Sequence, residues 1–127
     1  MIIREKDEAH IRAVNAVESV WRGVAGDVPE HDYIVPDGVW YSLKTCGIKV
    51  GYLAFLPEDG FTSVHIGVLP EWRGQWVYPC VRKAISEQTG KLKVRVRSHA
   101  AYAMAYRVGF RKTGIDAGEW IDMELKR

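Results

Sequence analysis

The chain has 127 residues, of which 47% are hydrophobic and 27% are charged, and its formal net charge is +2. These ordinary values predict one globular domain spanning 1–127, large enough to fold without disulfides or a structural metal. Cys46 and Cys80 are too few for a metal or disulfide framework, which favours a reduced cytoplasmic protein without a metal site. The charged N-terminus and the short apolar runs predict neither a signal peptide nor a membrane helix in this sequence.

The N-terminal part predicts a short strand, one helix and a loop. Ile2 and Ile3 form the strand, and the carboxylate of Asp7 can cap the following helix. Within 8–25, apolar residues recur at spacings of three and four and form one stripe: Ile11, Val14, Val17, Trp21 and Val24. Two prolines and weak periodicity in 27–38 favour a solvated loop over a functional site for its polar cluster: Glu30, His31, Asp32 and Tyr33.

The middle of the chain predicts a three-stranded antiparallel meander over 39–46, 48–56 and 61–69. The first two strands join at Cys46-Gly47, and the second pair joins through 57–60, whose Asp-Gly is a strong hairpin signal. The last strand alternates, with one apolar face (Val64, Ile66, Val68) and one mixed face (Ser63, His65, Gly67).

The C-terminal half predicts two further strand and helix units. A helix runs from about Gln75 to Thr89, with Pro79 near its start and Gly90 at its end. An alternating strand over 91–97 has one apolar and one basic face, and Ser98 can cap a last helix that Gly109 closes. A final strand covers 120–125, so the order is β-α-β-β-β-α-β-α-β in an α+β or mixed α/β domain.

The junction between the third meander strand and the helix carries the clearest functional signal. Backbone N–H groups are unpaired at a helix start, so a strand that leads directly into a helix suits phosphate binding. Here Val68, Leu69 and Pro70 are followed by Glu71, Trp72, Arg73 and Gly74. With Ala101 and the pair Gly109-Phe110, this order resembles the GNAT superfamily of acyl-CoA-dependent N-acyltransferases over most of the chain.

The resemblance implies a mostly antiparallel sheet with helices on both faces and acetyl-CoA as cosubstrate. It assigns cosubstrate binding to the end of the strand, to the following loop and to the residue that stands where the family usually has Asn: Ile66, Val68, Arg73, Gly74, Gln75, Trp76 and Ser98. The sequence departs from the family pattern at Trp76 and Tyr78, where glycines would let the pyrophosphate approach the backbone, and Pro79 removes one N–H. The alternative for Arg73 is a solvated cation at the helix start.

The resemblance also implies direct attack of an amine on the thioester, with a backbone N–H near Val68 polarising the carbonyl. His65 is the candidate base because a histidine titrates near neutral pH, although a structural strand histidine is the alternative. The family's usual tyrosine, which protonates the thiolate, falls on Ala105, so Tyr102 and Tyr106 on adjacent turns are the candidate acids.

The sequence therefore supports two alternative functions. The first is an N-acetyltransferase that acts on an amine of a small molecule or protein. The second is an inactive GNAT-fold protein that acts through protein contacts, for example a bacteriophage structural or host-interaction protein. Trp72 and Trp76, four residues apart, could form an interaction patch for the second. Modest net charge favours a solvated strand face over nucleic-acid binding for the basic stripe Lys91, Lys93, Arg95 and Arg97. Exposed sheet edges in this architecture often pair, which leaves a homodimer open.

Overall fold

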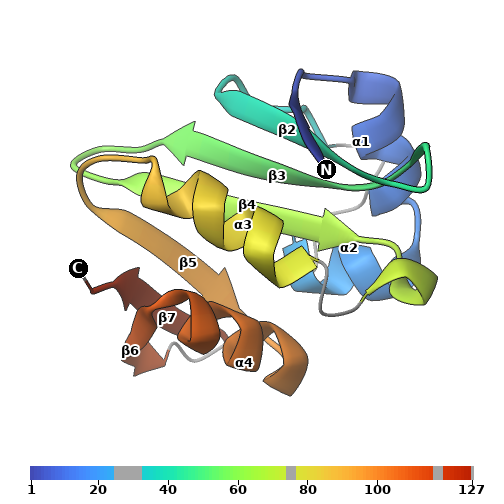
Figure 1. Cartoon of the computed structure of the whole chain (residues 1–127). Helices are drawn as coiled ribbons and strands as arrows, with labels where there is room; N and C mark the ends of the chain where they lie inside the picture. Colours follow the sequence, from blue (N-terminus) through green and yellow to red (C-terminus); the bar gives the residue numbers. More distant parts are fainter. Residues whose placement is uncertain (25–32, 74–76, 116–118, 127) are drawn as a thin grey trace.

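The computed structural model describes residues 1–24, 33–73, 77–115 and 119–126. Within them, one mixed sheet runs in the order β1-β2-β3-β4-β5-β7-β6 (Figure 1). Each neighbouring pair is antiparallel except β4 and β5, which are parallel. The strands are β1 Ile2–Arg4, β2 Val39–Thr45, β3 Ile48–Pro57, β4 Thr62–Val68, β5 Leu92–Val96, β6 Phe110–Ile115 and β7 Ile121–Leu125.

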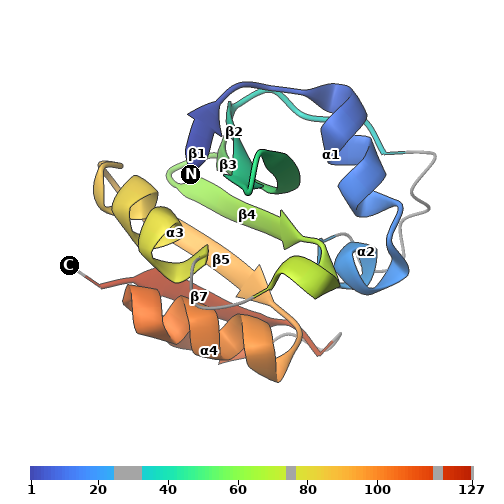
Figure 2. The same cartoon turned by 45° about the vertical axis from the view of Figure 1, so that its right-hand side comes forward.

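Two pairs of helices cover opposite faces of the sheet (Figures 1 and 2). On one face lie α1 (Glu8–Asn15) and α2 (Glu18–Val24); on the other lie α3 (Val77–Ser86) and α4 (His99–Val108). The α3/α4 side has a core that extends from β2 to β7, whereas the core under α1 contains no described residue of β5, β6 or β7. The predicted mostly antiparallel sheet with helices on both faces is confirmed.

The strand and helix order needs two corrections. The single helix expected over 8–25 is two helices, because Asn15 is buried and its amide oxygen accepts a hydrogen bond from the Tyr52 hydroxyl at 2.6 Å, which ties the end of α1 to β3. The segment after α4 is a strand, β6, which pairs with β7. Its register shifts between Lys112 and Gly114, and this bulge interrupts the alternation that would have revealed the strand.

The local signals that end the elements behave as expected. The side chains of Asp7 and Ser98 cap α1 and α4, and Gly109 ends α4 in the left-handed conformation. Cys46 and Gly47 both have positive φ, 50° and 77°, which matches a two-residue hairpin between β2 and β3. Pro79 is the third residue of α3, where an N–H has no intrahelical partner.

Candidate functional site

The parallel pairing between β4 and β5 stops early. Thr62 pairs with Leu92 and Ser63 with Lys93, but β4 continues to Val68 and β5 to Val96 without further pairs. Figure 1 shows the two strands diverging from this point. The sheet is therefore split between its two central strands.

The backbone of β4 presents hydrogen-bond donors to this split. The N–H of Leu69 donates to the carbonyl of Val50 in β3, and the N–H of Thr62 donates to the carbonyl of Lys91 on the β5 side, both at 2.9 Å. Alternate residues of a strand direct their amides to opposite neighbours, so the N–H groups of Ile66 and Val68 point toward β5. Both lie beyond the last paired residue, at the opening.

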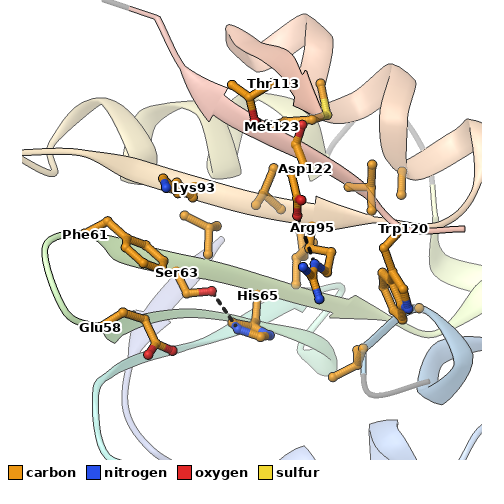
Figure 3. Close-up of a pocket in the computed structure, with 17 residues that line it drawn as sticks. Glu58, Phe61, Ser63, His65, Lys93, Arg95, Thr113, Trp120, Asp122 and Met123 are labelled. Atoms are coloured by element: carbon orange, nitrogen blue, oxygen red, sulfur yellow. Dashed lines mark hydrogen bonds and ion pairs between the residues drawn. The ribbon is translucent and has the colours of Figure 1, made fainter. Parts of the chain in front are cut away.

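A cavity of about 710 Å³ lies at the split. Val64 and Val96, which line it, also belong to the core on the α3/α4 side, whereas the polar lining comes from the opposite face of the sheet (Figure 3). The labelled lining residues are Glu58, Phe61, Ser63, His65, Lys93, Arg95, Thr113, Trp120, Asp122 and Met123. The cavity thus connects the two faces of the sheet.

His65 is the half-buried titratable side chain on the β4 wall of the cavity. Its Nε2 lies 3.0 Å from the Ser63 hydroxyl oxygen, and the imidazole tautomer decides which atom donates. Burial lowers the pKa of His65 below its ordinary value, and the Glu58 carboxylate opposes this by raising the pKa. The imidazole is therefore neutral at neutral pH and can accept a proton.

No protein-family model and no curated protein matches this sequence. Solved structures match over nearly the whole chain. A protein from Klebsiella pneumoniae assigned to the acyl-CoA N-acyltransferases has 21% identity and a TM-score of 0.68, covering 98% of this chain and 95% of that one. A GNAT family acetyltransferase from Elizabethkingia anophelis, with acetyl-CoA bound, has 14% identity and a TM-score of 0.62, covering 100% and 97%. The fold is that of the GNAT acyltransferases.

An acetyltransferase of the GNAT family from Bacillus anthracis gives the same result, with 12% identity and a TM-score of 0.66 over 97% of this chain and 91% of that one. At such identities the shared property is the GNAT fold. The residues of this chain must carry any argument about its chemistry.

Arg73 follows the GNAT-like strand end and has a structural contact there. Its Nε donates to the carbonyl of Val68 at 3.1 Å, which closes the turn after β4. Between them, Pro70–Trp72 form a 3₁₀ turn, and Trp72 is half-buried against the core. Gly74, Gln75 and Trp76, the other predicted loop ligands, lie outside the described residues.

Of the α4 residues singled out in the sequence, Ala101 lines the cavity, whereas the candidate acids Tyr102 and Tyr106 do not. Tyr102 packs against the core, and Tyr106 is 48% exposed. The two rings stack at 6.3 Å, and the Arg111 guanidinium lies 3.8 Å from the centre of the Tyr106 ring. The Ser98 hydroxyl accepts from the N–H of Ala101 at 3.2 Å. The acid role of the tyrosines and the ligand role of Ser98 stay predictions.

Sequence reasoning missed several polar residues that line the cavity. Ser63 could have been predicted from the sequence, because it lies two residues before His65 and therefore on the same face of the strand. Asp122 could not have been predicted, because its bond to Arg95 depends on the register of β5 and β7. Glu58 and Trp120 lie just outside strands, where periodicity does not indicate the direction of a side chain.

The described residues contain no group of three or more His, Cys, Asp or Glu side chains arranged to hold a metal ion. None of the described helices has the length and apolar character of a membrane span.

Proposed function

We propose that this protein is an acyl-CoA-dependent N-acyltransferase that moves the acetyl group of acetyl-CoA to an amine. The observation that carries the proposal is the split between β4 and β5, which leaves the N–H groups of Ile66 and Val68 directed toward β5, with Ile66 and His65 lining the cavity at the split. A thioester substrate needs such donors, because its carbonyl oxygen gains negative charge when an amine attacks.

Each of these groups has a distinct task in the proposed reaction. The N–H groups of Ile66 and Val68 hydrogen-bond carbonyl groups of the acyl-CoA and stabilise the developing oxyanion. His65 accepts a proton from the incoming ammonium, and Ser63 fixes the orientation of the imidazole through the 3.0 Å contact. Arg73 holds the turn that follows Val68. It thereby keeps in place the end of the donor edge, which is the side of β4 that carries the N–H groups of Ile66 and Val68.

Binding of the nucleotide end is the step on which this chain differs most from the family pattern. Pro79 leaves α3 one N–H short at its third residue. The first two helical residues, Val77 and Tyr78, retain backbone N–H groups that a helix start can offer to phosphate. We propose that these groups, with Arg73, take the pyrophosphate.

Calorimetric titration with acetyl-CoA tests the proposal, with desulfo-CoA and adenosine diphosphate as comparators. We expect saturable binding with a micromolar constant, about −8 kcal/mol. Arg73→Ala should weaken it, whereas Lys112→Ala, which removes an exposed cation on the edge strand β6, should not. Release of free thiol in the presence of a mixture of amines then measures transfer.

The opposite result has an equally clear meaning. If millimolar acetyl-CoA gives no heat of binding and no thermal stabilisation, the transferase proposal is rejected. The protein would then be an inactive member of the fold, and a search for protein partners would follow.

A further inference from the structure

The cavity beside His65 has a charge pattern that fits one class of amine. Its charged lining residues in the described chain are Glu58, Lys93, Arg95 and Asp122. Arg95 donates from Nε to Asp122 Oδ1 at 2.9 Å, so these two charges cancel. In the described chain, neither Glu58 nor Lys93 takes part in an ion pair. Among its described lining residues, the cavity therefore has one unmatched negative charge, Glu58, and one unmatched positive charge, Lys93.

Lys93 is left unmatched for a structural reason. Its cross-strand neighbour on β7 is Glu124, but Glu124 pairs with Lys91 at 3.8 Å. The ammonium of Lys93 instead lies 4.6 Å from the centre of the Phe61 ring. A ring contact leaves N–H donors of the ammonium available, so Lys93 can bind a carboxylate without losing an ion pair.

Lys93 and His65 lie on the same face of the sheet. Ser63 is the β4 partner of Lys93, and Ser63 also contacts His65 at 3.0 Å, so the ammonium and the imidazole come from neighbouring positions. Figure 3 shows Glu58 on the side of β4 where His65 lies, with Lys93 across the split. A ligand at His65 therefore meets a carboxylate from one direction and an ammonium from another.

We infer that the amine acceptor is a free amino acid, whose carboxylate binds Lys93 while its ammonium lies between Glu58 and His65. This inference rests on the proposed function. A polyamine would bring a second cation toward Lys93, and a peptide N-terminus or a lysine side chain has no carboxylate beside its amine. An amino acid matches both unmatched charges and leaves the pair of Arg95 and Asp122 intact.

The amine nitrogen loses two protons during the proposed transfer. His65 removes one proton from the ammonium and gives a neutral amine. The amine nitrogen forms a bond to the thioester carbonyl carbon, and the bond from that carbon to sulfur breaks. The second proton lost by the nitrogen is gained by the departing thiolate. The products are an N-acetyl amino acid, free coenzyme A and one proton released from His65.

The test compares each common L-amino acid with its own carboxamide, which keeps the amine and the side chain but lacks the carboxylate. Product is measured by mass spectrometry, and acetyl-CoA binding is measured by calorimetry on the same samples. For the best amino acid, we expect kcat/KM to exceed that of its amide by about tenfold or more, as for a hydrogen bond to a charged group.

Variants of Lys93 separate a specific contact from general charge. Lys93→Met should remove most of the preference for the acid over the amide, mainly through KM, and leave acetyl-CoA binding unchanged. Lys93→Arg should restore much of it. Lys112→Met, which removes a lysine outside the cavity lining, should retain the preference of the native protein.

Each outcome decides between the two proposals. Binding of acetyl-CoA with acetylation of spermidine or a peptide but of no free amino acid overturns the acceptor assignment alone. Equal use of acid and amide, or an unchanged preference in Lys93→Met, does the same. Failure to bind acetyl-CoA overturns the proposed function, and the acceptor assignment falls with it.

Discussion

His65 is partly buried, and among the described residues the Glu58 carboxylate opposes the effect of burial on its pKa. The balance of the two effects sets the pH at which His65 accepts a proton. Burial lowers its pKa and Glu58 raises it. The lowered pKa also affects stability, because the unfolded chain binds a proton near the ordinary value of 6.5 and the folded chain does so only at lower pH. The stability that comes from keeping His65 neutral is complete above pH 6.5. It is lost as the pH falls from the pKa of the unfolded chain to the lower pKa of the folded chain.

Glu58→Gln should move the titration of His65 to lower pH, because it removes the charge that stabilises the imidazolium. An NMR titration of the His65 ring measures this directly and without any acceptor. Glu71→Gln, an exposed carboxylate on the 3₁₀ turn, is the matched control and should leave the titration unchanged. A shift toward higher pH in Glu58→Gln would contradict the electrostatic account.

Gly67 leaves space for a buried ring. A Cβ at this position would lie 2.8 Å from Tyr52 Cε2 and 2.9 Å from Cζ, and Tyr52 is only 1% exposed. Gly67→Ala should therefore destabilise the protein by about 1–3 kcal/mol, the usual cost of overpacking. Urea unfolding measures the loss. Gly114→Ala is the control, because nothing lies within 4 Å of its added Cβ, and an equal loss in both variants would reject the steric explanation.

At the scale of elements, α4 shows how one residue can have two candidate roles. The Ser98 hydroxyl caps the helix through Ala101, and the family resemblance also assigns Ser98 to cosubstrate binding. Ser98→Ala should cost about 1 kcal/mol through loss of the cap. Ser98→Asp should recover that stability, because Asp also caps, while its negative charge should weaken acetyl-CoA binding if the phosphates approach Ser98. Urea unfolding and calorimetry measure the two effects, and unchanged affinity in Ser98→Asp would limit Ser98 to its capping role.

Elements with local signals were predictable, and those defined by distant contacts were not. Asp7, Ser98 and Gly109 mark helix ends because a cap involves only neighbouring residues. The break after α1 depends on Tyr52, which is far away in sequence, and β6 depends on pairing across a bulge. The site divides in the same way. His65 follows from strand alternation, whereas its surroundings from Glu58 and β7 require the tertiary structure.

At the scale of the whole molecule, the split divides the sheet into β1–β4 and β5–β7, held together on the α3/α4 side by a common core. The opposite face has no such continuous core among the described residues. A ligand that enters the split therefore contacts both halves. Its binding free energy adds to the stability of the folded state, as for any ligand specific to the native form.

Amide hydrogen exchange should detect ligand binding in the split directly. The N–H groups of Ile66 and Val68 should exchange rapidly in the free protein and slow by at least about tenfold when saturating acetyl-CoA occupies the split. The N–H of Leu69 is the internal control, because it already bonds to Val50 in the free protein. A uniform slowing of all amides would indicate general stabilisation without contact at the donor edge.

The open donor edge of β4 also has a consequence for handling the protein. Unpaired strand amides accept an extended peptide as readily as a small molecule, and they are a common starting point for strand addition between chains. In most sheets this hazard lies at the outer strands, but here the split places it in the interior of the sheet. A compound that fills the split would then prevent strand addition between chains during concentration and storage, whether or not the protein turns it over.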